Sequence, residues 1–363
     1  MSGLDLLTRS DRPDSSVRPG RAGIVRPARL SVLRRNLADI RWPGGWPEHS
    51  VAAGTTGIFD DRRPVSRRGW LLFAAMSVIW GLPYLFIRIA VEYLTPGTLV
   101  FFRTAGAAVV LLPLALARSQ VAPVLARWRP LVLFTAIEVM LPWLLLSDAE
   151  RKLSSSLAGL LVAAVPLVGA LLARFSSPAD RVTGSQLAGL LLGVVGVVAL
   201  VGLDFSGLNL FAFAEMAVVS VCYATGPIVL TRSLADLPGA GVIAVSMALT
   251  AVCYLPFLLL QPPEHLPASA VSGVVVLSLV CTALAFLLFF QLIATIGPTR
   301  STVITYVNPA VAIALGVLVL GENITAGMLV GFPLILAGSI LAARRSRTVA
   351  ANRSEEITPV AAA

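Results

Sequence analysis

Two ionisable residues lie inside apolar stretches of the sequence that are long enough to cross a membrane. Glu138 lies at the centre of the block 130–147, and Arg103 lies in the block 96–117. A charge at mid-membrane costs roughly 2.5–3.5 kcal/mol on insertion scales, so such residues usually serve a function. A carboxyl at that depth must be protonated, paired or hydrated. We therefore expect Glu138 either to form a structural ion pair with Arg103 or to handle protons or a polar solute.

Two further charged residues lie nearer the ends of apolar blocks. Arg88 is close to the end of the block 70–92, and Glu215 is in the second turn of the block 208–230. A side chain near a helix end can extend its charged group to the membrane surface. That explanation accounts for both residues at least as well as a functional role does.

Rings, an amide and prolines near the middle of other blocks could contact an organic solute. Aromatic side chains stack and hydrogen-bond, although core packing explains them equally well. Proline frees backbone carbonyls, and interrupted helices of that kind mark ligand sites in membrane proteins, yet proline is also common in ordinary membrane helices. Together with Arg103 and Glu138, the predicted solute pathway comprises Trp80, Pro166, Tyr223, Tyr306, Asn308 and Pro309.

The apolar blocks lack the combinations of residues that metal or nucleophilic chemistry needs. The only two histidines, His49 and His265, lie outside them, so we predict no His-ligated metal site in the membrane and no cofactor. Cys222, Cys253 and Cys281 lie inside apolar blocks and form no disulfide framework; we expect them to be small buried hydrophobic residues. With no nucleophile–base pair or metal cluster in the blocks, we predict that the chain is not an enzyme.

Ten apolar blocks must position these residues. The 363 residues are 57% hydrophobic and 13% charged, with a mean hydropathy of +0.86, whereas a soluble domain carries roughly 25% charged residues. Blocks of about 20 residues match the thickness of the hydrocarbon layer, where only a helix satisfies its own backbone. We therefore predict an all-α polytopic membrane protein with ten transmembrane helices at 70–92, 96–117, 130–147, 153–173, 185–203, 208–230, 239–260, 269–292, 299–319 and 325–343.

The N-terminal tail differs from the rest of the chain in composition. Residues 1–66 are rich in Arg, Pro, Gly and Ser without sustained apolar periodicity, so we expect disorder; an over-extended start codon is the alternative explanation. Residues 1–68 hold 13 Arg against 7 Asp or Glu, which accounts for most of the net charge of +9. Most of the remaining basic residues lie in short loops, so the charge does not indicate nucleic-acid binding.

The distribution of basic residues in alternate connections predicts the orientation of the chain. One side receives 15 Arg, and the other receives only Arg151 and Lys152. Because basic residues are enriched in cytoplasmic loops, both termini, including the tail 344–363, should be cytoplasmic. This arrangement requires an even number of spans. It fits a multi-pass protein of the plasma (inner) membrane.

The sequence repeats after 143 residues, which divides the chain into the halves 70–203 and 208–343. Landmarks of the first half meet similar residues in the second: Trp80 meets Tyr223, Leu153 meets Ile296, and Pro166 meets Pro309. Each half holds five predicted helices, an odd number, so the second half should be inverted relative to the first. Inverted repeats can adopt two exchanged conformations of similar energy, with a solute site near the midplane.

Small residues recur at helical spacing in the last block of each half. These are Gly189, Gly193 and Gly196 in one block and Gly327 and Gly331 in the other. Such spacing lets helices approach closely. It favours packing of the two helices within one chain over the alternative, a homodimer through them.

Several of these motifs together resemble a known family, the EamA-type transporters of the drug/metabolite superfamily. The resemblance covers about 70–343 and is carried by Ile79-Trp80-Gly81, Phe101-Phe102-Arg103, Ala149-Glu150, Ser154-Ser155-Ser156 through Pro166, Ser301 through Gly321-Glu322 to Gly331, and Leu336-Ala337-Gly338. One departure is Ala179 before Asp180, where the family usually has glycine. The resemblance implies gradient-linked permeation of metabolites, often export. It leaves the substrate open among amino acids, nucleosides, sugars and drugs.

The sequence therefore predicts a permease of small metabolites or drugs whose partners are the solute and the lipid bilayer. An ion channel is less well supported because neither a carbonyl filter loop nor a ring of charges is present. A membrane scaffold is the other alternative, although a charge at Glu138 would be costly for one. Substrate, direction and coupling ion stay open.

Overall fold

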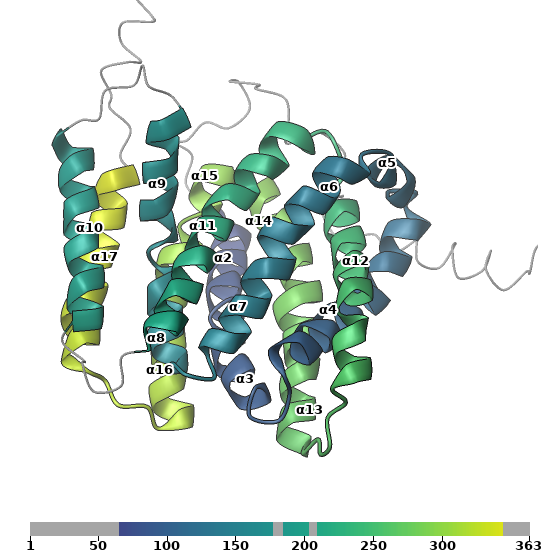
Figure 1. Cartoon of the computed structure of the whole chain (residues 1–363). Helices are drawn as coiled ribbons and strands as arrows, with labels where there is room; N and C mark the ends of the chain where they lie inside the picture. Colours follow the sequence, from purple (N-terminus) through teal and green to yellow (C-terminus); the bar gives the residue numbers. More distant parts are fainter. Residues whose placement is uncertain (1–64, 177–183, 203–208, 344–363) are drawn as a thin grey trace, which may run out of the picture. The chain divides into compact units, whose positions relative to one another are not determined.

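A computed structural model describes residues 65–176, 184–202 and 209–343, and these ranges contain helices and no strand (Figure 1). The two tails and the loop with Asp180 lie outside the described residues. Seven helices are long and apolar enough to span a membrane, namely 67–90, 96–117, 128–149, 155–172, 210–233, 239–260 and 268–296. Three shorter apolar helices cover 184–200, 304–320 and 326–342. The all-α prediction is confirmed.

The first half contains α2 to α10, and hydroxyl caps mark three of the starts, with Ser66 accepting a hydrogen bond from the Gly69 amide before α2. Thr95 accepts a hydrogen bond from the Thr98 amide, and Ser154 accepts one from the Leu157 amide, as N-caps do. The helices are α2 (Arg67–Ile79), α3 (Leu82–Ala90), α4 (Pro96–Ala117), α5 (Val121–Ala126), α6 (Trp128–Thr135), the π-helical turn η1 (Ala136–Met140), α7 (Leu141–Ala149), α8 (Ser155–Val162), α9 (Val165–Ser176) and α10 (Gly184–Gly202).

The second half follows the same order and again carries a π-helical segment in its third membrane helix. Asn209 caps the first helix of this half through the Ala212 amide, and Gly321, with φ +68°, terminates α16 in the left-handed conformation. The helices are α11 (Leu210–Ser233), α12 (Gly239–Leu260), α13 (Ala268–Val275), η2 (Val276–Leu284), α14 (Ala285–Ile296), α15 (Pro298–Ser301), α16 (Ile304–Leu320) and α17 (Ala326–Ala343).

Helices that occupy equivalent places in the two halves pack against one another. α4 packs on α12, α8 on α16, and α10 on α17. The contact of α3 with α13 has its counterpart in the contact of α7 with α11. The two halves therefore share an interface whose pattern is preserved when the halves are exchanged.

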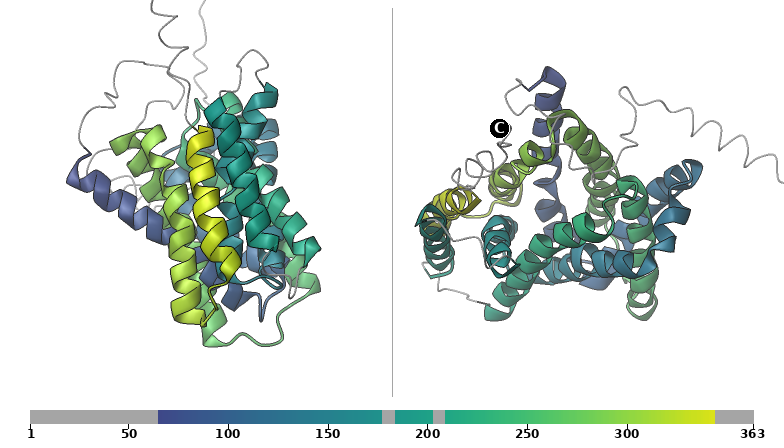
Figure 2. Two further views of the ribbon diagram at one scale, coloured as in Figure 1. Left: turned by 90° about the vertical axis from the view of Figure 1, so that its left-hand side faces the viewer. Right: turned by 90° about the horizontal axis from the view of Figure 1, so that it is seen from above.

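The pair α10–α17 is the closest of these contacts. The two helices lie side by side in Figures 1 and 2, and they run antiparallel because Gly189 lies beside Gly338 while Gly196 lies beside Gly331. A Cβ added to Gly331 would lie 2.8 Å from the Gly196 carbonyl oxygen, so a larger residue would force the helices apart. Packing within one chain is confirmed; the homodimer stays a prediction.

The first membrane helix is broken at Trp80-Gly81, between α2 and α3. The Gly81 amide donates to the Val78 carbonyl, which leaves the Ser77 carbonyl without its usual helical donor. The side-chain amide of Asn308 on α16 is assigned the orientation in which its nitrogen faces two carbonyl oxygens, so that it donates to Ser77 O at 3.1 Å and to Ile304 O at 2.9 Å. A side chain of the second half therefore satisfies the carbonyl that the break exposes.

The fourth membrane helix is broken in the same manner, directly before Pro166. The Leu167 amide donates to Ala164, and the freed Ala163 carbonyl accepts the Ser339 hydroxyl of α17 at 3.4 Å. The sequence predicted this interruption at Pro166.

The equivalent interruption at Pro309 was also expected, and that prediction is wrong. α16 continues through Pro309, and the chain is irregular instead at Thr302-Val303, before the helix begins. The amides of Thr305 and Tyr306 bond three residues back, so the first turn is tightened upstream of the proline. α11 likewise runs unbroken past Tyr223, so only the first half has broken helices at these places.

Candidate functional site

Arg103 is a buried cation that the described residues do not pair with an acid. It lies on α4, 7% exposed, and its Nε donates to the Thr282 hydroxyl at 3.1 Å. Its guanidinium carbon lies 3.6 Å from the centre of the Trp143 ring. A desolvated cation–π contact of this kind is worth about 2 kcal/mol or more. The Trp143 ring covers one face of the guanidinium, and Arg103 forms no salt bridge with any described residue.

The ion pair expected between Glu138 and Arg103 does not form, and that prediction is wrong. Glu138 lies in η1, where its carboxylate packs directly on Gly226 of α11. Its Oε2 is buried without a hydrogen-bond partner. Because Arg103 stacks on Trp143 instead, the two charges have separate surroundings. The proton- or solute-handling role of Glu138 stays a prediction.

Tyr223 connects these two environments. It lies on α11 at the margin of both main hydrophobic clusters, and its phenol lies against Trp143. Glu138 is an electrostatic neighbour of the same phenol. The structure therefore groups Arg103, Trp143, Tyr223 and Glu138 between α4, α7, η1 and α11.

The other residues of the predicted pathway lie elsewhere. Trp80 packs against Phe286 and Phe289 of α14, with ring centroids 6.0 and 4.7 Å away. Pro166 lies in the first turn of α9, and Tyr306 and Pro309 lie near the start of α16. Asn308 donates to the Ser77 carbonyl that the break in the first membrane helix frees. Their part in a solute pathway stays a prediction.

A second polar layer lies at one end of the helices, where the connections 91–95, 150–154, 261–267 and 321–325 are found. We call it the Glu150 end. Glu150 follows α7, is 0% exposed, and neither of its carboxyl oxygens has a hydrogen-bond partner. Burial raises the pKa of Glu150 well above its usual range, and the Glu322 carboxylate raises it further, whereas the charges of Arg88 and Arg103 lower it.

Glu322 joins the two halves at this end. It follows α16, and its carboxylate accepts the amides of Ser155 at 2.7 Å and Ser156 at 2.9 Å, together with the Ser156 hydroxyl. These amides are among the free donors at the start of α8, where a negative charge also meets the positive end of the helix dipole. Glu322 is therefore a cap from one half on a helix of the other.

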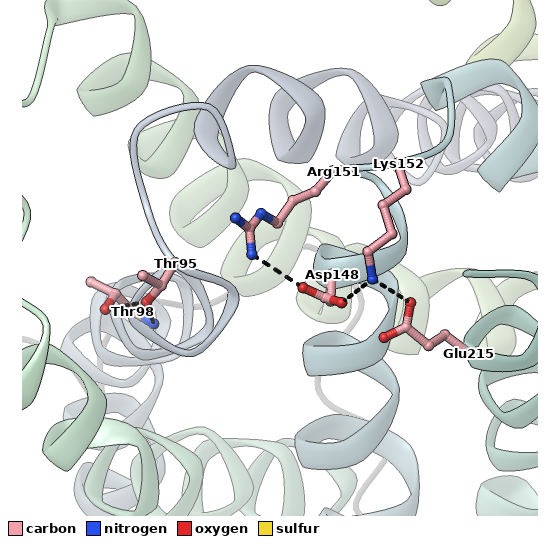
Figure 3. Close-up of polar contacts among 6 residues, drawn as sticks. All are labelled: Thr95, Thr98, Asp148, Arg151, Lys152 and Glu215. Carbon is pink, nitrogen blue, oxygen red and sulfur yellow. Dashed lines mark hydrogen bonds and ion pairs between the residues drawn. The ribbon is translucent and has the colours of Figure 1, made fainter. Parts of the chain in front are cut away.

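A surface ion network lies beside this layer (Figure 3). Lys152 Nζ is 2.6 Å from Asp148 and 3.6 Å from Glu215, and Arg151 is 3.4 Å from Asp148. Glu215 is 6% exposed and pairs with Lys152 in the connection between α7 and α8, so it does not extend to water as expected. Arg88 pairs with Glu92 at 3.5 Å near its helix end.

Two cavities open beside the network. One, of about 280 Å³, is bordered by Asp148 and Glu215 and is otherwise largely apolar, with Phe211 and Phe257 in its wall. The other, of about 320 Å³, is polar and is lined by Arg88, Glu92, Arg151, Lys152, Leu153, Ser154, Leu320 and Glu322.

Some of these residues escaped sequence reasoning. Glu150 and Glu322 entered the sequence analysis only as parts of the motifs that resemble the family. No role was predicted for them, because each follows an apolar block, as an ordinary loop residue does. Trp143 and Thr282, which hold Arg103, lie in blocks where aromatic and small polar residues are common. Cys253 was expected to be buried, but it is exposed on α12 beside Val252. Exposed apolar residues of this kind are typical of a helix face that meets lipid rather than protein. Cys222 and Cys281 are buried.

Comparison with known proteins identifies the fold independently. No curated protein sequence matches the chain. A solved crystal structure, titled only as that of a protein, matches with a TM-score of 0.56 at 22% identity over 76% of this chain and 96% of its own. The model of the EamA-like transporter family matches twice, at 67–202 and at 211–344, once for each half. The chain therefore belongs to the EamA-like transporter family.

Proposed function

We propose that this protein is a permease of the plasma (inner) membrane that exports small metabolites or drugs by alternating access, driven by a proton or solute gradient. The observation that carries the proposal is the pairing of equivalent helices from two family-matched halves. Such an interface supports two conformations that differ by exchange of the roles of the halves.

In this proposal all ten apolar helices span the membrane, and the second half is inverted. The antiparallel run of α10 and α17 supports the inversion, as does the odd number of apolar helices, five in each half of the described chain. Both termini are then cytoplasmic, and the Glu150 end faces outward, in agreement with the distribution of arginine.

The burial of polar residues supports a state closed at the Glu150 end. Glu150, Ser155 and Ser156 are fully buried there, whereas Glu138 and Tyr223 are only partly buried. A solute entering from the opposite end would meet Glu138 and Tyr223 before Arg103. A cation stacked on an aromatic ring beside a phenol suits an organic solute that combines a polar group with an apolar body.

The proposal is tested by transport with two arginine variants. A strain that overproduces the protein is screened for tolerance to toxic amino acids, nucleosides and drugs, and the solutes that score are measured in proteoliposomes. Arg103→Gln should reduce transport at least tenfold at normal membrane level, whereas Arg129→Gln, on the exposed face of α6, should match wild type. If no solute changes tolerance and none is moved by purified protein, the chain is not a permease.

A further inference from the structure

Glu150 is a buried acid that forms no ion pair with any described residue. Its side chain is completely buried, and neither carboxyl oxygen forms a well-aligned hydrogen bond, although the backbone of Arg88 and the charges of Arg88 and Arg103 act on it. We propose that Glu150 is a proton-binding site of the transporter and that its ionisation opens the Glu150 end. This inference rests on the proposed function, for which it names the coupling ion as the proton.

The surroundings of Glu150 favour the neutral acid in the closed state. A buried carboxylate without hydrogen bonds loses its hydration with nothing in return, whereas the neutral form loses much less. The charged groups that face it come from three elements: Arg88 on α3, Arg103 on α4, and Glu322 after α16. Tyr84 on α3 faces it as well, as a neutral phenol. The two cations are already engaged, with Glu92 and with Trp143 and Thr282 respectively.

The neighbour that turns ionisation into movement is Glu322. Its carboxylate links the end of α16 to the start of α8, and Gly316 has no room for even a Cβ beside this contact. A negative charge on Glu150 would repel the carboxylate that closes this interface. The repulsion is relieved when the connection 321–325 moves away from α8. Proton loss therefore favours opening, and proton binding favours closure.

Protons can reach this position from the polar cavity of about 320 Å³. Its wall includes Arg88 and Glu322, the same groups that act on Glu150. Glu150 itself does not line the cavity, so it exchanges protons with solvent when the interface loosens. A site that is reached from one end only in one state is what coupling to a proton gradient requires.

The experiment measures conformation, so it needs no known substrate. Cys222, Cys253 and Cys281 are replaced by alanine in the full-length protein, and spin labels are attached at Tyr93→Cys and Ile324→Cys, both exposed at the Glu150 end. The distance between the labels is measured in lipid nanodiscs between pH 5 and pH 9. The longer, open distance should become more populated as pH rises, by up to about tenfold per pH unit for a single proton.

Three variants distinguish the proton site from its neighbours. Glu150→Gln should remain closed across the range, and Glu150→Met tests the same point if Gln does not fold. Asp148→Asn removes an acid two residues away that is paired with Lys152 at the surface, and it should titrate like wild type. A wild-type transition that persists unchanged in Glu150→Gln, or the lack of any transition in wild type, would overturn the proposal. If the protein transports a solute but shows no pH-dependent transition, the proton site is rejected and the permease function is kept. If the transition occurs but no solute is transported, the permease function is rejected and the proton site is kept.

Discussion

Replacing Asn308 by Asp turns the hydrogen-bond donor to the Ser77 carbonyl, at the break in the first membrane helix, into an acceptor. The two side chains have nearly the same shape, but Asp presents only oxygen to the carbonyls of Ser77 and Ile304 when it is ionised. The substitution therefore changes polarity without creating a cavity. Asn308→Ala removes the donor and leaves space as well.

The expected loss of stability follows from the two hydrogen bonds of 3.1 and 2.9 Å. Leaving a buried carbonyl without a partner costs about 1–3 kcal/mol, and the Ser77 carbonyl is in that position because Gly81 bonds elsewhere. Hydrogen bonds between membrane helices average about 0.6 kcal/mol in double-mutant cycles, with a maximum near 1.7. We expect Asn308→Ala to cost about 1–2 kcal/mol and Asn308→Asp to cost more, since oxygen would face oxygen.

The assay is reversible unfolding in mixed micelles, with Ser339→Ala as the matched comparison. Ser339 serves the break in the fourth membrane helix through a single, longer bond of 3.4 Å, so its loss should cost less than about 1 kcal/mol. Wild-type stability of Asn308→Asp would refute the reasoning, as would a larger effect of Ser339→Ala than of Asn308→Ala.

Four other changes test separate parts of the structure. Because Glu138 does not pair with Arg103, Glu138→Gln should keep the normal protein level, and adding Arg103→Gln should not raise it; a lower level restored by the second substitution would revive the ion pair. Gly196→Leu should reduce the folded yield severalfold, measured by size-exclusion chromatography, since α17 lies against it. Burial raises the pKa of Glu150, so its contribution to wild-type stability decreases as pH rises above about 4.3, the pKa of a free glutamate side chain. Denaturation curves of Glu150→Gln should show a smaller decrease over the same pH range. A cysteine at residue 350 should resist impermeant reagents in intact cells, and labelling there would reject the proposed orientation.

The helices and their repeat could be predicted from sequence because both depend on short-range properties. Apolar length alone indicates a membrane helix, and the offset between Pro166 and Pro309 is visible in the order of residues. The glycines at 189, 196 and 331 also predicted close packing of α10 and α17 within the chain, although not that these two helices are partners.

The partners of the buried charges could not be predicted in the same manner. Whether Arg103 meets Glu138 or Trp143 depends on how the third helix is rotated about its axis, and η1 alters that rotation by inserting an extra residue in the turn. The burial of Glu150 depends on α3, α4 and the end of α16, which are distant in sequence. Pro166 and Pro309 occupy equivalent places in the two halves, yet the helix is broken beside Pro166 and continuous through Pro309.

The packing of equivalent helices has a consequence for how the protein is made. A ribosome delivers α4, α8 and α10 to the membrane well before their partners α12, α16 and α17 exist. The small-residue face of α10 and the free amides at the start of α8 therefore lack their partners until the chain is almost complete. The first half cannot finish its own packing, and a nascent chain that stops before α16 exposes both surfaces at once to quality-control proteases.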